Sequence, residues 1–155
     1  MKIRKLESVD IPFVAELIKR NFDEVIIKHH SFHIIEDFKS RNTTDKIEKQ
    51  MKWKEIFVVE LNGEIVATGA LANFGNVEIP KYSISNFFVK PELHSQGIGR
   101  KLFNHLFELF RSKNVKDLHV PSTRNGLRFY EKMGFIKDLE QNDLHEEITW
   151  MTMNI

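Results

Sequence analysis

Two glycines at the start of an amphipathic segment are the residues whose type and spacing point most directly to chemistry. Gly97 and Gly99 follow a short loop, and an apolar stripe at helical spacing begins at Ile98. Glycine lets a ligand approach the backbone closely, and the free N–H groups of a helix's first turn attract anions. Arg100 and Lys101 add positive charge beside them. The turn therefore predicts a phosphate site, against the alternative of a glycine-rich helix start that binds nothing.

This glycine turn differs from two other phosphate-binding loops. The dinucleotide fingerprint requires a third glycine where this chain has Leu102. The P-loop requires Gly-Lys-Ser/Thr, whereas Gly99 is followed here by Arg100 and Lys101. Both departures count against a domain that binds ATP or a dinucleotide.

The elements that would position this turn alternate between strands and helices. Asn62-Gly63 predicts a tight hairpin, and Pro121 is expected to end the strand before it. Ser8 or Asp10 is expected to cap the first helix, and Gly134 to end the last one. Strands are predicted at residues 3–6, 55–61, 64–71, 82–89, 118–120, 135–136 and 148–153, and further helices at 44–51, 97–112 and 125–133, while 25–38 fits helix or loop. This pattern indicates an α/β or α+β domain around one sheet.

Length and composition exclude several classes of protein. The 155 residues predict one domain, residues 1–155. With 23 basic and 22 acidic residues the net charge is +1, which gives no support for general nucleic-acid binding. The absence of cysteine excludes disulfides, a Cys-ligated zinc site and a thiol nucleophile. Because no apolar run reaches the roughly 18 residues of a membrane helix, we expect a cytoplasmic protein without nucleic-acid or membrane partners.

A second stretch, residues 122–135, reads Ser-Thr-Arg-Asn-Gly-Leu-Arg-Phe-Tyr-Glu-Lys-Met-Gly-Phe. Together with the glycine turn, the Asn62-Gly63 hairpin and the start Ile3-Arg4-Lys5-Leu6 before Asp10-Ile11-Pro12, it resembles the GNAT N-acetyltransferase superfamily over nearly the whole chain. The resemblance implies transfer of an acetyl group from acetyl-coenzyme A to an amine by direct attack, with no metal. It also implies an α/β (α+β) fold: a mixed, mostly antiparallel sheet of about six to seven strands flanked by about four helices.

The resemblance further implies which residues bind acetyl-coenzyme A. Backbone N–H groups from about Gln96 to Lys101 would hold the pyrophosphate, and the strand 87–89 would pair with the pantetheine arm. The first position of the family's turn is Arg or Gln, but here it is His94. The family often has an Asn before the next helix, where this chain has Thr123, and the nearby Asn125 would take over its contact. The predicted set is Phe87, Phe88, Val89, His94, Ser95, Gln96, Gly97, Ile98, Gly99, Arg100, Lys101 and Asn125.

Acetyl transfer requires donors for the carbonyl oxygen and for the departing thiolate. By resemblance, Tyr130 faces the coenzyme sulfur and is the predicted acid. The alternative is a half-buried ring whose hydroxyl is satisfied elsewhere. A backbone N–H near Phe88 or Val89 is the candidate donor to the carbonyl oxygen.

The base that frees the attacking amine has no obvious residue. Some family members carry a Glu on the strand before the turn, and the matching position here is Ser85, followed by Asn86. Water held by either residue is therefore the expected base. His119 and Glu78 are weaker candidates. For His119, the alternative is a partly buried histidine whose ring is hydrogen-bonded, which is more common on a strand.

Three histidines near residue 30 allow a metal interpretation. His29 and His33 would share a helix face, and Glu36 or Asp37 could complete a zinc site. His30, however, stands where a metalloprotease carries its catalytic Glu. We therefore favour partly exposed side chains, and the resemblance to the GNAT family implies that this region borders the acceptor pocket.

Charge patterning leaves further alternatives. The acidic stretch 138–147 is either a solvated loop or an attractor for a cationic amine. Arg124, Arg128 and Lys132 could meet coenzyme phosphates or pair with surface acids. The rival function is a non-catalytic acyl-coenzyme A binding or sensor module. A small-molecule or protein amine is the expected acceptor, and the resemblance allows a homodimer.

Overall fold

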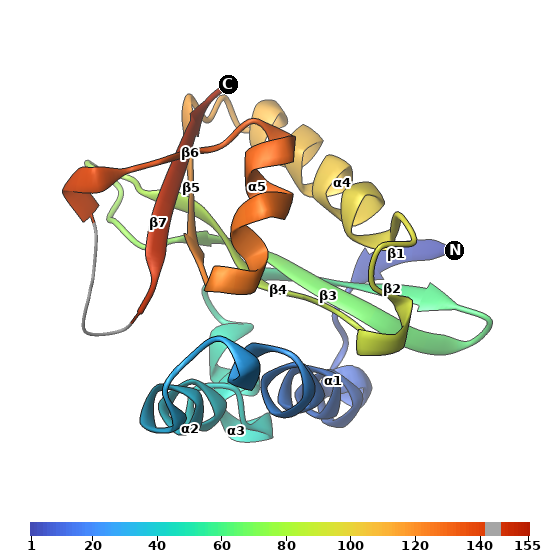
Figure 1. The fold of residues 1–155 in the computed structure, drawn as a ribbon. Helices are drawn as coiled ribbons and strands as arrows, with labels where there is room; N and C mark the ends of the chain where they lie inside the picture. Colours follow the sequence, from blue (N-terminus) through green and yellow to red (C-terminus); the bar gives the residue numbers. More distant parts are fainter. Residues whose placement is uncertain (142–146) are drawn as a thin grey trace.

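A seven-stranded sheet organises the computed structural model, which describes residues 1–141 and 147–155 (Figure 1). The strand order is β1-β2-β3-β4-β5-β7-β6, and the pairs are antiparallel except for β4 with β5. This confirms the mixed, mostly antiparallel sheet expected from the sequence. The strands are β1 Lys2–Lys5, β2 Glu55–Leu61, β3 Glu64–Asn73, β4 Tyr82–Val89, β5 Asp117–Ser122, β6 Ile136–Lys137 and β7 Thr149–Asn154.

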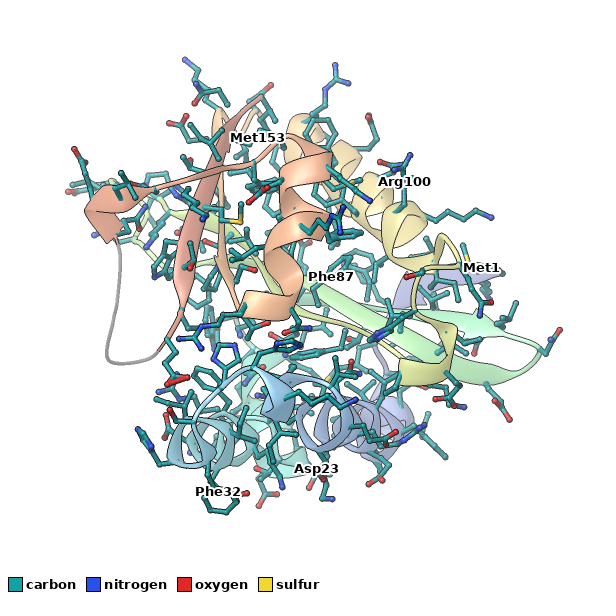
Figure 2. The ribbon with its side chains drawn as sticks, in the orientation of Figure 1. Met1, Asp23, Phe32, Phe87, Arg100 and Met153 are labelled. Atoms are coloured by element: carbon teal, nitrogen blue, oxygen red, sulfur yellow. The ribbon has the colours of Figure 1, made fainter. Side chains whose placement is uncertain are left out.

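Helices cover both faces of the sheet (Figure 1). On one face lie α1 Ile11–Glu24, α2 Phe32–Ser40 and α3 Thr44–Gln50, and on the other lie α4 Ile98–Ser112 and α5 Leu127–Met133. Each helical layer packs its own core against the sheet: Val14, Ile18 and Ile35 are fully buried in one, and Leu102, Leu106 and Phe110 in the other. Figure 2 shows Phe32 pointing outward from α2, whereas Phe87 lies between the sheet and α5.

Two tight turns form as the sequence predicts. Asn62 and Gly63 adopt positive φ angles of 53° and 80°, which is the geometry that a two-residue hairpin between β2 and β3 requires. Gly134 ends α5 with φ 110°. The predicted strand at 82–89 and the helix after Gly97 are also confirmed, with Gly97 as the N-cap residue of α4.

The sheet opens between β4 and β5. Their register pairs only Ser83 with His119 among the described residues, so the rest of β4 toward Val89 has its edge free on that side. A β-bulge also interrupts the pairing of β3 with β4, where Thr68 faces Phe88 and Ala70 faces Ser85. The diverging strands and the bulge together create room in the middle of the sheet.

Several predictions about element boundaries were wrong. β5 continues through Pro121 to Ser122, because a proline without an N–H is tolerated where one strand edge lacks a partner. Asp10 does not cap α1 with its side chain: its carboxylate accepts the Glu7 N–H at 2.8 Å, in the capping box of the 3-10 turn before α1, and two bonds from Arg4 at 2.7 and 2.9 Å. Residues 25–38, for which the sequence left helix or loop open, form a short 3-10 turn and most of α2. The described part of the chain holds five α-helices, in agreement with the expected number of about four.

Within the described part of the chain, no helix has the length and apolar character needed to cross a membrane.

Candidate active site

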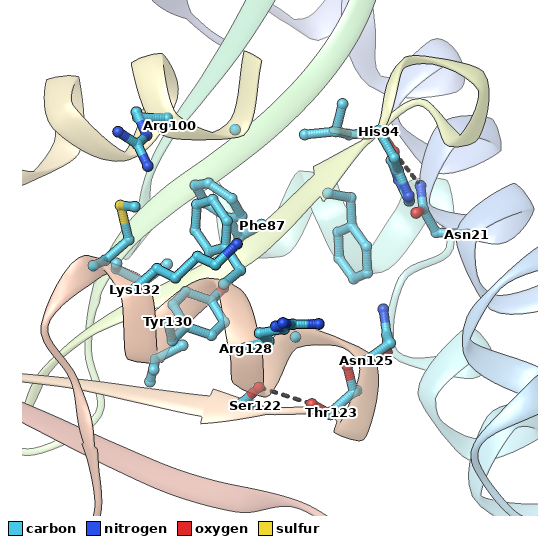
Figure 3. A pocket seen from close by; sticks show the side chains of 18 of the residues that line it. Asn21, Phe87, His94, Arg100, Ser122, Thr123, Asn125, Arg128, Tyr130 and Lys132 are labelled. Carbon is cyan, nitrogen blue, oxygen red and sulfur yellow. Dashed lines mark hydrogen bonds between the residues drawn. The ribbon is translucent and has the colours of Figure 1, made fainter. Parts of the chain in front are cut away.

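A cavity of about 670 Å³ lies where β4 and β5 diverge (Figure 3). Its walls come from β4, the loop before α4, the first turn of α4, the end of β5 and α5. Figure 3 shows Arg100 and Lys132 at one side, and Asn21 and His94 at the other. The two segments that carried the family resemblance therefore meet in one hollow.

The glycine turn lines this cavity with exposed backbone. Gly97 has φ +86°, and a Cβ added there would meet nothing within 4 Å. Its conformation strains any other residue, and the space beside it is open for a ligand. The N–H of Lys101 donates to the Gly97 carbonyl at 3.1 Å, so the amides left free by helix geometry are those of residues 98–100. The turn therefore presents a positive helix end to the cavity.

Gly99 has a structural role that sequence reasoning missed. A Cβ at Gly99 would lie 3.3 Å from Cε1 of Phe129 and 3.6 Å from Cγ2 of Val89. The missing side chain thus lets α5 pack closely on the start of α4. This contact, as well as any ligand, explains a glycine at this position.

The free end of β4 is held by one side chain from α1 and one from the loop before α4. The Val89 carbonyl accepts hydrogen bonds from Asn21 Nδ2 at 3.0 Å and from His94 Nε2 at 2.7 Å (Figure 3). His94, which stands where the family's turn has Arg or Gln, therefore binds the protein backbone through its ring. Asn21 was not anticipated from the sequence, because only the fold brings α1 to this strand.

The predicted coenzyme-binding residues divide into two groups. Gln96, Ile98 and Lys101 do not line the cavity with the others, and Ile98 is buried in the core. Asn125 does line it, with Oδ1 accepting a 2.7 Å bond from Thr123 Oγ1. The cavity is lined by Phe87, Phe88, Val89, His94, Ser95, Gly97, Gly99, Arg100 and Asn125 from the predicted set, and also by Arg128 and Lys132.

Tyr130 lies inside the cavity wall with its hydroxyl unpaired. Its ring packs against Phe87, Phe129 and Phe135, with centroids 6.1, 5.3 and 5.6 Å away. Among the described residues the hydroxyl has no hydrogen-bond partner, so the alternative of a hydroxyl satisfied elsewhere has no support. Burial raises the pKa of Tyr130, so the phenol keeps its proton at neutral pH.

The candidate bases are separated by the fold. Ser85 and Asn86 line the cavity, whereas His119 and Glu78 do not. His119 Nδ1 lies 3.4 Å from Gln141 Nε2, and burial lowers the pKa of its imidazole. Glu78 lies in the exposed connection between β3 and β4.

Lys54 is a polar residue of this region that the sequence did not indicate. Its Nζ lies 2.9 Å from Ser85 Oγ and 2.9 Å from Asn86 Oδ1. Burial lowers the pKa of Lys54 to about 8. No local pattern marks this lysine among its neighbours, because the contact spans 31 positions of sequence.

The zinc interpretation of the histidines is not supported by their placement. α2 begins at Phe32, so His29 lies outside the helix that carries His33, and the two cannot share a helix face. Among the described residues, no group of three or more His, Cys, Asp or Glu side chains is placed to hold a metal. His30 is buried and bonded on both ring nitrogens, to Glu147 Oε1 at 3.1 Å and to the Arg124 N–H at 3.0 Å.

The acidic stretch 138–147 is described only in part. Residues 142–146 lie outside the described residues, so its predicted role as a loop or as an attractor of amines stays untested. Glu147 binds the N–H and the hydroxyl of Ser31 as well as His30. These bonds lower the pKa of Glu147 to about 2 and fasten the start of α2 to the segment before β7.

Comparisons with known proteins agree with this geometry. The family model described as acetyltransferase (GNAT) domain matches residues 21–155. An amino-acid acetyltransferase from Neisseria meningitidis is 26% identical over 132 residues, which are 85% of this chain and 27% of that protein. The chain thus spans about a quarter of the length of the curated relatives it matches.

Solved structures share the fold. A PaiA N-acetyltransferase from Thermoplasma acidophilum, in complex with coenzyme A, superposes with a TM-score of 0.82 at 18% identity, covering 99% of this chain and 98% of that one. N-acetylglutamate synthase from Neisseria gonorrhoeae, complexed with coenzyme A and N-acetyl-glutamate, gives a TM-score of 0.68 at 22% identity, covering 99% of this chain and 34% of that one. With the family model matching most of its length, the chain belongs to the GNAT acetyltransferase family.

Proposed function

We propose that residues 1–155 form one acetyltransferase domain that transfers the acetyl group of acetyl-coenzyme A to an amine by direct attack of the amine. One observation carries this proposal: a single cavity joins the glycine turn and its cations to the polar residues Ser85 and Asn86, and the unpaired Tyr130 hydroxyl lies in its wall. Binding, leaving-group protonation and amine attack can therefore occur within one hollow.

The residues of the cavity fit an acyl-coenzyme A. The open space at Gly97, the free amides of the first turn of α4 and the cations Arg100, Arg128 and Lys132 suit phosphates. The free edge of β4 at residues 87–89 offers backbone groups to an extended amide chain. When bound, acetyl-coenzyme A supplies the acetyl group already activated as a thioester.

The chain's own groups would then act on the reacting atoms. A backbone N–H near Phe88 or Val89 donates to the acetyl carbonyl oxygen, where negative charge develops. The Tyr130 hydroxyl, protonated at neutral pH, donates to the departing sulfur. The apolar rings of Phe87 and Phe129 line the cavity nearby and exclude water, which strengthens both interactions.

The acceptor is proposed at the level of an amine. The curated relative named an amino-acid acetyltransferase and the neighbour that holds N-acetyl-glutamate place α-amino acids in the first group to test. A neighbour named ribosomal-protein-alanine N-acetyltransferase, from Brucella melitensis, adds peptide N-termini to that group. Polyamines and aminoglycosides complete the panel.

Thiol release from acetyl-coenzyme A with this panel tests the function. We expect acetyl-coenzyme A to raise the melting temperature by mass action, and at least one amine to raise the rate of thiol release above the rate in water. Stabilisation by the coenzyme without amine-dependent release would support a non-catalytic acyl-coenzyme A sensor. Stabilisation by ATP or NAD alone would contradict both.

A further inference from the structure

A lysine-centred hydrogen-bond cluster lies directly behind the polar end of the cavity. Lys54 follows α3, and its Nζ lies 2.9 Å from Ser85 Oγ and 2.9 Å from Asn86 Oδ1 on β4. Asn86 Nδ2 donates to Gln50 Oε1 at 2.7 Å, and the Ser85 hydroxyl donates to Asn86 Oδ1 at 2.7 Å. Ser85 and Asn86 line the cavity, but Lys54 does not. The lysine therefore meets the cavity only through these two side chains.

The surroundings of Lys54 disfavour a permanent charge. Its Nζ lies 4.9 Å from the centroid of the Trp53 ring and 5.5 Å from that of the Phe74 ring. Among the described residues no carboxylate forms an ion pair with it, and desolvation is the cause of its low pKa of about 8. A lysine in this condition can hold or release a proton near neutral pH.

We propose that Lys54, acting through the Ser85 hydroxyl, takes up the proton that the acceptor ammonium must lose before it attacks. The inference rests on the proposed acetyl transfer and adds to it a path for this proton. As the Ser85 oxygen takes a proton from the ammonium, the proton of its own hydroxyl passes to the Lys54 amine. The ammonium becomes a free amine, Ser85 is unchanged, and Lys54 becomes charged.

The geometry suits both charge states of Lys54. When Lys54 is charged, it donates to Ser85 Oγ at 2.9 Å while the Ser85 hydroxyl donates to Asn86 Oδ1. When the amine is neutral, the Ser85 hydroxyl can turn from Asn86 Oδ1 and donate its proton to the Lys54 lone pair over the same 2.9 Å contact. Asn86 Oδ1 accepts from Lys54 in either state. Since the lysine is only partly buried, it can return the proton to water between turnovers.

Asn86 gives this cluster a fixed position in the site. It has a positive φ of 51° at the bulge of β4, a conformation that its side-chain bonds to Lys54 and Gln50 help to hold. Lys54 therefore acts as a positioning residue for Ser85 and Asn86 as well as the final holder of the proton. If Lys54 only held Ser85 and Asn86 in place, its charge and hydrogen bonds would be enough. If it also accepts the proton, it must lose its own proton first, and this requirement can be tested.

The pH dependence of kcat/KM separates the two roles. In the wild type we expect a rise with an inflection near pH 8, where Lys54 loses its proton. Lys54→Met and Lys54→Arg should both lose at least about tenfold at pH 7, and the inflection should move to the pKa of the free amine substrate. Lys52→Met, which removes an exposed lysine two residues away, is the matched control and should keep the wild-type profile.

Ser85 variants test the same path where Lys54→Met fails to fold. Ser85→Ala should show the loss and the shifted inflection, and Ser85→Thr, which keeps the hydroxyl, should restore the profile. A wild-type pH profile in Lys54→Arg, or in Ser85→Ala, would overturn the relay. Lys54 would then only hold Ser85 and Asn86 of β4 in place.

Titration of Lys54 without substrate gives a readout independent of turnover. In protein labelled at lysine Cε, the NMR signal missing from Lys54→Met should titrate near pH 8, against about 10.4 for an ordinary lysine. A midpoint above about 10 would overturn the relay. If no amine supports thiol release by the wild type, the proposed function fails; if it does but the Lys54→Met profile is unchanged, only the relay fails.

Discussion

The two ends of the cavity are built in opposite ways. The donor end, defined by Gly97, Gly99 and Arg100 with the α5 cations, comes from two continuous segments and offers mainly backbone groups. The proposed acceptor end, defined by Ser85 and Asn86 with Lys54 behind them, consists of side chains from β4 and from the segment after α3 that hydrogen-bond to one another. The donor end should therefore be sensitive to any added Cβ, and the acceptor end to the chemical identity of each side chain.

The largest effect is expected at the donor end. Gly97→Val should weaken acetyl-coenzyme A binding by about a hundredfold or more, because the new side chain fills the space beside the free amides of α4. Backbone strain at φ +86° should lower the free energy of unfolding by about 1–2 kcal/mol. Isothermal titration calorimetry and urea unfolding measure the two quantities.

Gly63→Val is the matched control for this change. Gly63 also has a positive φ, +80°, and a Cβ there would also meet nothing within 4 Å, but it lies in the hairpin between β2 and β3 and does not line the cavity. Both variants should lose similar stability, and only Gly97→Val should lose coenzyme affinity. Unchanged affinity in folded Gly97→Val would place the phosphates elsewhere.

Tyr130 lines the same cavity, and its hydroxyl should matter for rate and not for binding. Tyr130→Phe is expected to lower kcat by at least about tenfold, since a protonated phenol is lost beside the departing sulfur. Affinity for the coenzyme should change little because the ring keeps its packing against Phe87, Phe129 and Phe135. Single-turnover kinetics should measure the chemical step directly.

The second tyrosine of the chain provides the control. Tyr82 begins β4 and does not line the cavity, so Tyr82→Phe should keep kcat and coenzyme affinity. Wild-type kcat in Tyr130→Phe, with chemistry limiting the rate, would leave water as the proton donor and Tyr130 as a packing residue.

The contrast between the ends also explains what the sequence could predict. The local geometry of the donor end could be predicted because Gly97 and Gly99 lie within one short motif that fixes a turn and the start of a helix. The hairpin turn at Asn62-Gly63 could be predicted for the same reason. The place of Lys54 beside the cavity could not be predicted from the sequence. It depends on a contact with Ser85 that spans 31 positions and on burial by aromatic rings.

Errors in the prediction have the same origin. Pro121 stays within β5 because the neighbouring β4 diverges there, a fact that no local rule contains. Asp10 has the residue type of a helix cap, but its carboxylate is bound by Arg4, and Arg4 also bonds Glu60 on β2. Tertiary contacts thus redirected residues whose local preferences were clear.

A smaller effect is expected where the two layers are joined. Asn21→Leu removes the bond from α1 to the Val89 carbonyl and should lower the free energy of unfolding by about 1–2 kcal/mol. Coenzyme affinity should fall only a few-fold, because His94 still binds the same carbonyl. Urea unfolding and calorimetry provide both values. Asn21 Nδ2 also donates to the Leu17 carbonyl at 3.0 Å, and Asn42 Nδ2 makes the equivalent bond to the Phe38 carbonyl but none to β4. Coenzyme affinity should therefore be unchanged in Asn42→Leu, and an equal loss in both variants would show that the bond from Asn21 to Val89 does not support the coenzyme site.

The smallest effect concerns pH and the contacts of His30 with Glu147 and Arg124. Burial lowers the pKa of His30, despite the Glu147 carboxylate that opposes this shift and alongside the charges of Arg124 and His29 that add to it. Its Nε2 accepts the Arg124 N–H at 3.0 Å, so the folded state requires a neutral ring. Below the unfolded pKa of about 6.5 the unfolded chain binds the proton more readily.

Stability from His30 is therefore complete above about pH 7 and declines as the pH falls toward 5, by at most about 1.4 kcal/mol per pH unit. Urea unfolding at pH 7, 6 and 5 should show a shallower decline in His30→Gln than in the wild type. His119, whose pKa is also lowered by burial, contributes equally to both proteins and cancels in this difference. His33→Gln, at an exposed position on α2, should keep the wild-type slope. Parallel slopes for wild type and His30→Gln would show that the bond to Arg124 does not require the neutral ring.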